Sequence, residues 1–111
     1  MDTSRASSAF AALSQPIRVD VLRLLVKAGP DGMAAGAIGE ALGVRQNTMS
    51  ANLATLAAAG LIASARDGRR VIYRADMDGI AALIGFLMED CCGGAPEACR
   101  AVLDTLTCEA R

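Results

Sequence analysis

Apolar residues recur at helical spacing through the first quarter of the chain and predict two helices. The segment from Ser4 to Leu13 has a helix-forming composition, and Pro16 is suited to the first turn of a second helix, which Gly29 ends. Apolar side chains occupy one face of this second helix and extend onto its other sides; they are Ile17, Val19, Val21, Leu22, Leu24, Leu25 and Val26. We therefore expect the second helix to lie buried at the centre of the fold.

The next segment has the pattern of two short helices separated by a glycine-containing turn. An alanine-rich helix is expected over 33–43, and a more polar helix runs from about Arg45 to Ala59, where Gly60 stops it. At 100° per residue, one side of the polar helix carries Met49, Leu53 and Leu56, and the other carries Asn47, Thr48, Ala51 and Thr55. The first side predicts core contact, and the second predicts a small polar surface. This outline is that of a helix-turn-helix.

From residue 61 the pattern changes to short strands. The runs 61–66 and 70–74 are β-prone, and the Asp67-Gly68 pair between them is typical of a hairpin turn. Helices then resume with an apolar stripe at helical spacing, which consists of Ile80, Leu83, Ile84, Leu87 and Met88. A last helix is expected from Glu97 to Glu109. The sequence predicts a mainly α (α+β) single domain over residues 1–111, with about five to six helices and a two-stranded β-hairpin.

Composition limits the classes of function open to the chain. Its 111 residues, 53% apolar and 3% aromatic, suffice for one helical domain and leave no room for a second, catalytic one. No apolar run approaches the roughly 20 residues of a membrane span, and the first residues lack the basic-then-apolar order of a signal peptide. We therefore expect a cytoplasmic protein with no membrane partner. In that compartment clustered cysteines more often bind metal or do redox chemistry than form disulfides.

The net charge of −1 conceals an uneven distribution. Residues 44–75 carry five arginines against one aspartate, whereas residues 76–111 hold seven acidic residues and two arginines. The middle third is therefore the candidate surface for a polyanion such as DNA. Contacts to phosphates or to a minor groove are expected at the hairpin tip from Arg66, Arg69 and Arg70. An ordinary solvated, charged hairpin is the alternative interpretation.

The polar helix at 45–59 would supply the contacts to bases. Residues at the start of a recognition helix usually reach deepest, and amide side chains can pair bidentately with adenine. The expected base contacts are Gln46, Asn47 and Thr48, while Ser50 is suited to a phosphate. A surface helix with a face of small residues is the alternative interpretation of this segment.

Three segments carry a family resemblance: ALSQPIRVDVLRLL near the start, SANLATLAAAGLI in and after the polar helix, and RDGRRVIYR in the hairpin. Together they resemble the ArsR family of winged-helix metal-responsive repressors, over about residues 5–90. The resemblance implies a homodimeric winged helix-turn-helix that binds operator DNA and leaves it when ligand binds. The stripe from Ile80 to Met88 would supply part of the two-fold interface. Asn52 stands where the family usually has His, and Arg45 where many members have a capping Ser.

The ligand site that this resemblance implies lies in the cluster CCGGAPEAC at residues 91–99. The family's CxCxxC arsenic site is missing, because the chain has GMAAGAIG there, and His-based metal sites are missing because the chain has no His. The cluster resembles that of a subgroup of arsenic-responsive members, with an adjacent cysteine pair and a third cysteine shortly downstream. Cys91, Cys92 and Cys99 match this arrangement.

The chemistry of three thiolates agrees with a metalloid ligand. Trivalent arsenic or antimony takes three sulfurs in a pyramid, whereas four-coordinate zinc or cadmium would want another ligand. Gly93 and Gly94 permit the bend that lets neighbouring cysteines share one ion. Cys108 lies nine residues after Cys99, half a turn off on a continuous helix, and is expected to be a spare or buried thiol. Small cysteines in a core are the alternative interpretation of the cluster.

These observations predict a DNA-binding transcriptional repressor, not an enzyme, which arsenite or antimonite releases from its operator through a metalloid-binding segment at 89–111. One alternative keeps the repressor and makes the trigger a thiophilic cation (cadmium, lead or copper(I)) or thiol oxidation. Another is a small thiol-dependent metalloid enzyme. Against the enzyme, the chain has no His, no phosphate-binding glycine loop and no dinucleotide fingerprint.

Overall fold

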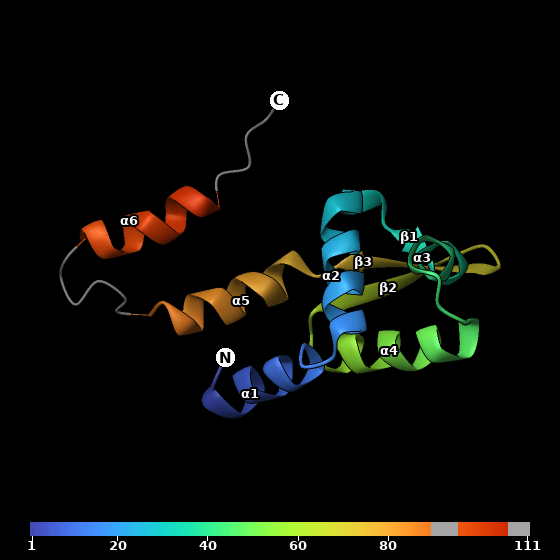
Figure 1. Cartoon of the computed structure of the whole chain (residues 1–111), viewed down its shortest axis with the longest axis horizontal. Helices are drawn as coiled ribbons and strands as arrows, with labels where there is room; N and C mark the ends of the chain where they lie inside the picture. Colours follow the sequence, from blue (N-terminus) through green and yellow to red (C-terminus); the bar gives the residue numbers. More distant parts are fainter. Residues whose placement is uncertain (90–95, 107–111) are drawn as a thin grey trace.

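The computed structural model describes residues 1–89 and 96–106 (Figure 1). In order, the elements are α1 Thr3–Ala12, α2 Pro16–Ala28, the 3-10 turn η1 Gly29–Asp31, β1 Met33–Ala34, α3 Ala35–Leu42, α4 Gln46–Ala58, β2 Ile62–Asp67, β3 Arg70–Ala75, α5 Met77–Leu87 and α6 Pro96–Thr105. The order confirms a mainly helical fold in which a β-hairpin follows a helix pair. In the ranges described, no helix is long and apolar enough to cross a membrane.

The hairpin is part of a three-stranded sheet, so the expectation of a two-stranded wing was incomplete. β1 pairs antiparallel with β3, Met33 opposite Tyr73 and Ala34 opposite Ile72, and gives the strand order β1-β3-β2. Gly32 permits this pairing, because its φ is +67° and a Cβ there would clash with the Tyr73 carbonyl oxygen. Since β1 takes up the first two residues of the segment at 33–43, α3 starts only at Ala35.

Helix α2 lies against α3, α4 and β3, but it is not buried on all sides as its composition predicted. Val21 and Leu25 are fully buried, whereas Val19 and Val26 are 37% and 44% exposed. The neighbouring elements cover only one side of α2, which leaves the opposite apolar residues at the surface. The fully buried large side chains come from α2, α3, α4 and the residue just before β2; they are Val21, Leu25, Ile38, Met49, Leu53, Leu56 and Leu61.

The last helix is α6, and the expected span from Glu97 to Glu109 reaches beyond residue 106, where the described part of the chain stops. It begins at Pro96, which suits a first helical turn, and ends at Thr105. There the Thr105 hydroxyl donates to the Val102 carbonyl (2.7 Å), and the Leu106 N–H bonds to the Leu103 carbonyl, three residues back. A hydroxyl that competes for helix carbonyls favours such an end. Figure 1 shows α6 beyond α5, away from α4 and the sheet.

The first turn of α5 is joined to the chain segment that leaves α4. The Asp76 N–H donates to the Leu61 carbonyl (2.9 Å), and the Asp76 carboxylate caps α5 by accepting from the Gly79 N–H (2.9 Å). A Cβ at Gly79 would clash with the backbone oxygen of Gly60. The absence of a side chain at Gly79 therefore allows the two backbones to meet, and we call this contact the α4–α5 junction.

We predict that Gly79→Ala lowers the free energy of unfolding by about 1–3 kcal/mol, because the added methyl must push the Gly60 backbone away. Gly85→Ala is the matched control on the same helix, since nothing lies within 4 Å of a Cβ there. It should raise the free energy of unfolding by up to about 1 kcal/mol through helix propensity alone. Urea denaturation followed by circular dichroism measures both. Equal effects of the two substitutions would contradict the close contact.

Candidate nucleic-acid interface

Helices α3 and α4 form the helix-turn-helix, and α4 has the two faces that its sequence predicts. Gly43 ends α3 in the left-handed conformation (φ 66°), and the extended Arg45 leads into α4. Met49, Leu53 and Leu56 are fully buried in the core. Ala51 and Thr55, on the other face, are exposed. The α4 helix is therefore packed along one side and free along the side that would meet DNA.

The side chains expected to touch DNA from α4 are all exposed near its first turn; they are Gln46, Asn47, Thr48 and Ser50. Arg45, at the N-cap position, makes no side-chain capping bond. The Asn47 Oδ1 instead accepts a hydrogen bond from the Thr48 N–H (2.9 Å). Asn47 would have to give up this bond to pair bidentately with adenine, because that pairing uses both its amide oxygen and its amide nitrogen.

The hairpin stands beside the first turn of α4, and the two border a groove of about 440 Å³. Its lining consists of Gln46 and Ser50 from α4, Arg70, Val71 and Tyr73 from β3, and Ala34, Ala35 and Gly36 from β1 and the start of α3. Figure 1 shows the start of α4 and the β2–β3 turn at the same end of the molecule. Three side chains that were predicted separately from two segments therefore border one groove.

The three arginines at the hairpin tip, Arg66, Arg69 and Arg70, are all exposed. Arg70 Nη2 lies 3.7 Å from a carboxylate oxygen of Asp67, and the two side chains are 66% and 72% exposed. An ion pair so exposed contributes only about 0–1 kcal/mol and is weakened by salt. This pair leaves the Arg70 guanidinium able to turn to a phosphate.

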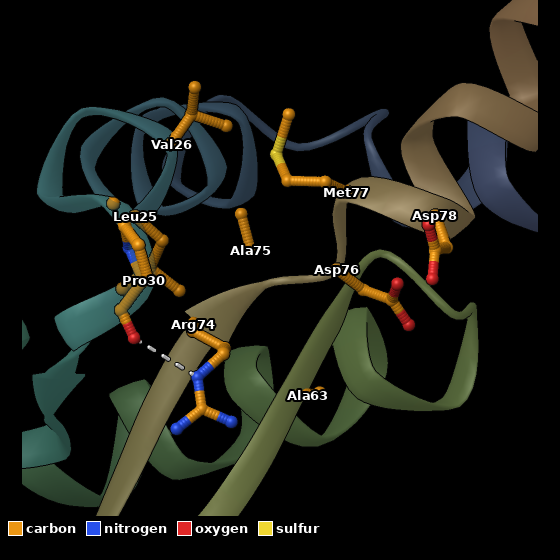
Figure 2. A pocket seen from close by; sticks show the side chains of 10 residues that line it. Leu25, Val26, Pro30, Ala63, Arg74, Ala75, Asp76, Met77 and Asp78 are labelled. Atoms are coloured by element: carbon orange, nitrogen blue, oxygen red, sulfur yellow. Dashed lines mark hydrogen bonds between the residues drawn. The ribbon is translucent and has the colours of Figure 1, made fainter.

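Arg74 has a different position from the other arginines of the basic segment. Its Nε donates to the Pro30 carbonyl (3.3 Å), which ties β3 to the turn after α2. Figure 2 shows Arg74 in a hollow of about 500 Å³ at the root of the wing, where Leu25 and Val26 of α2 approach Asp76 and Met77 at the start of α5. Arg74 therefore takes part in the join between wing and helices rather than in the groove beside α4.

Sequence reasoning missed a polar link beneath the recognition helix. Asn52 is 8% exposed, and its Oδ1 accepts a hydrogen bond from Arg18 Nη1 of α2 (3.2 Å). The Asn52 Nδ2 donates to the Thr48 carbonyl (3.0 Å). The sequence contained the signal, because Asn52 follows Met49 by three residues and Leu56 follows Asn52 by four, which places an amide inside the apolar stripe of α4.

Of the cysteine site predicted from Cys91, Cys92 and Cys99, the first two residues lie outside the described part of the chain, as does Cys108. The backbone of Cys99 belongs to α6, and its side chain is among the parts left undescribed. Within residues 1–89 and 96–106, no three His, Cys, Asp or Glu side chains are grouped so as to hold a metal ion. The three-thiolate site remains a prediction.

Comparisons with known proteins agree with this architecture. A helix-turn-helix domain family matches residues 13–65. The HTH-type transcriptional regulator YgaV of Escherichia coli K12 is 31% identical over 88 residues, which cover 79% of this chain and 87% of that protein.

Solved structures agree as well. A homodimeric winged helix-turn-helix DNA-binding domain from Mycobacterium bovis, described as a possible ArsR-family regulator, is 30% identical with a TM-score of 0.64, covering 78% of this chain and 81% of that one. An ArsR-like regulator from Rhodococcus sp. RHA1 is 27% identical with a TM-score of 0.68, covering 97% and 96%. The chain belongs to the ArsR family. It is a DNA-binding transcriptional regulator of the winged-helix type.

In this ArsR-family protein the charge of the described surface is arranged along the molecule. The exposed arginines of the wing lie at the same end as the first turn of α4. Asp78, Glu89 and Asp104 are exposed on or beside α5 and α6. The acidic helices therefore lie away from the surface that DNA would approach, which reduces the repulsion between the protein and the phosphates.

We predict that Asp67→Asn strengthens DNA binding by about 2- to 10-fold, because it removes the one acidic residue of the basic segment and releases Arg70 to the phosphates. The free energy of unfolding should change by less than about 0.5 kcal/mol, since the ion pair is exposed. Fluorescence anisotropy with a duplex selected in vitro measures the affinity. Asp104→Asn on α6 is the control, with the same change of charge away from the wing, and it should have a much smaller effect. If both substitutions strengthened binding equally, net charge rather than the wing would be responsible.

Proposed function

We propose that this ArsR-family regulator is a homodimeric repressor that releases its operator when trivalent arsenic or antimony binds Cys91, Cys92 and Cys99. The observation that supports DNA recognition most strongly is the groove that Gln46, Ser50 and Arg70 border between α4 and the wing. In this proposal the first turn of α4 enters the major groove and the wing arginines hold the backbone beside it.

A dimer is supported by the apolar surface of α1 and α5. These helices are neighbours in the fold, and Phe10, Ile84 and Leu87 on them are 46%, 37% and 54% exposed. Large apolar side chains exposed on neighbouring helices are typical of an interface core. The M. bovis domain of the same architecture is described as homodimeric. Two copies joined through α1 and α5 would present two recognition helices to two half-sites.

Trivalent arsenic or antimony is proposed as inducer because the three cysteines offer thiolate ligands and because they follow α5 in the chain. The cysteine pair follows α5 within a few residues, and Cys99 belongs to α6. One ion bound by all three thiolates would tie α6 to the end of α5. Because the start of α5 meets the end of α4 at the α4–α5 junction, a shift of α5 would reach the recognition helix. Couplings between two sites are typically about 1–3 kcal/mol, or 5- to 150-fold in affinity.

We predict that arsenite weakens operator binding by about 5- to 150-fold in the full chain, as such a coupling implies. Cys91→Ser, Cys92→Ser and Cys99→Ser should each abolish this effect while leaving binding without arsenite unchanged. Cys108→Ser is the matched control and should respond like the wild type. The measurement is fluorescence anisotropy of a labelled operator duplex, with and without arsenite, under a reducing agent that does not contain thiols.

Equal operator affinities with and without arsenite would reject the metalloid as inducer. If cadmium or peroxide released the DNA under the same conditions, the trigger would be a thiophilic cation or thiol oxidation. Loss of the arsenite response in Cys108→Ser would show that the fourth cysteine belongs to the site.

A further inference from the structure

The middle of the recognition helix carries a buried amide where an apolar side chain would pack. Asn52 is 8% exposed and stands beside Met49, Leu53 and Leu56, which are fully buried. An amide removed from water costs free energy unless its oxygen and nitrogen both find partners. Both do, because Asn52 Oδ1 accepts from Arg18 Nη1 at 3.2 Å and Asn52 Nδ2 donates to the Thr48 carbonyl at 3.0 Å.

The guanidinium that meets this amide is held from a second direction. Arg18 Nε donates to the Ala12 carbonyl at the end of α1, and Arg18 is half-buried. Within the described ranges Arg18 forms no ion pair with a carboxylate. Its charge lies where the carbonyls at the end of α1 favour a cation. Arg18 is therefore fixed by two oxygens on two different helices.

Together these contacts form a continuous series of hydrogen bonds that connects α1, α2 and α4. It runs from Ala12 of α1 through Arg18 of α2 to Asn52 of α4, and from there to the carbonyl of Thr48. Thr48 lies in the first turn of α4, among the exposed residues expected to contact bases. Apolar packing is non-directional, so the buried stripe alone tolerates small rotations of α4 about its axis. The hydrogen bond from the planar guanidinium of Arg18 depends on distance and angle, so it restricts such rotations.

We propose that Arg18 and Asn52 are positioning residues that set the rotation of the recognition helix relative to α1 and α2, and hence its fit to DNA. This role goes beyond the metalloid response and depends only on DNA binding. Neither residue needs to touch DNA. Base readout requires side chains placed within a fraction of an ångström, so a small rotation of α4 would lower affinity for the selected duplex more than affinity for random DNA.

The first test replaces the link while keeping the volume of the side chains. In the double variant Arg18→Met, Asn52→Leu, both polar side chains of the link give way to apolar groups, so neither partner is left facing an unpaired amide or guanidinium. The Ala12 carbonyl also loses its bond from Arg18 Nε, and the single variant Asn52→Leu, which keeps that bond, controls for this loss. We expect a melting temperature close to that of the wild type and at least about a tenfold loss of affinity for the selected duplex, as for the loss of a well-placed base contact. Affinity for a random duplex should change less, and the salt dependence of binding should stay the same, because no phosphate contact is removed.

The second test uses a titrating side chain and stays informative if the double variant fails to fold. The chain contains no histidine, so Asn52→His introduces its first imidazole. The neutral ring can accept from Arg18, whereas the protonated ring would face a second cation. Burial beside Arg18 lowers the pKa of this imidazole below its usual value of about 6.5. We therefore expect near-wild-type DNA binding at pH 8 and a loss of affinity, relative to wild type, that appears only below the usual imidazole pKa of about 6.5 and grows as the pH falls through the lowered pKa.

Three results would overturn the proposal. In the double variant, unchanged affinity and selectivity would show that packing alone positions α4. In the same variant, a decrease of about one in the magnitude of the slope of log affinity against log salt concentration would show that Arg18 itself binds a phosphate. In Asn52→His, a pH profile of DNA binding that matches the wild type would show that the link has no effect on recognition.

Discussion

Two backbones meet at the α4–α5 junction, where Gly60 ends the recognition helix and Gly79 lies in the first turn of α5. No side chain could be accommodated at Gly79 without moving the Gly60 carbonyl. The Asp76 cap and the bond from the Asp76 N–H to the Leu61 carbonyl hold the same two segments together. Interiors packed this closely transmit displacement rather than absorb it. The position of α5 and the position of the recognition helix are therefore determined together.

This constraint decides which parts of the recognition helix are held by the rest of the protein and which are free to contact DNA. The recognition helix is held at its far end by α5, in its middle by Arg18 and Asn52, and along its length by Met49 and the leucines of its buried face. The polar first turn and the arginine-tipped wing are left free to meet DNA. In the proposed mechanism a metalloid changes only the far end of α5, and the packed junction carries that change to the DNA-contacting end.

The sequence was sufficient for most of the architecture because periodicity reports which faces are buried. The split of α4 between Met49 and Leu53 on one face and Thr55 on the other is confirmed, as is the hairpin. Its turn is one residue later than the Asp67-Gly68 pair predicted, because Asp67 pairs with Arg70 and leaves Gly68 and Arg69 as the turn. Strand β1 was missed because two residues are too few for a periodic signal, and their pairing depends on a distant backbone at Tyr73. The exposure of Val26 was missed because composition cannot tell which side of a helix its neighbours cover.

The site was predictable to a smaller extent. Local pattern was enough to find Gln46, Ser50 and Arg70, but only the fold shows that they border one groove. The role of Asn52 was not apparent because its partner, Arg18, lies 34 residues away in the chain. Likewise, nothing in the sequence showed that Asp67 would pair with Arg70 or that Arg74 would donate a hydrogen bond to the Pro30 carbonyl.

Native-state hydrogen exchange of the full chain tests the central claim, that α4 and α5 move as one unit, most directly. The amides of Asp76 and Ile80 at the start of α5 are compared with those of Leu53 and Leu56 in α4, over a series of denaturant concentrations. The account predicts that all four open with the same free energy, close to that of global unfolding. Opening of the α5 amides at a free energy lower by about 2 kcal/mol or more, while those of α4 stay protected, would contradict it.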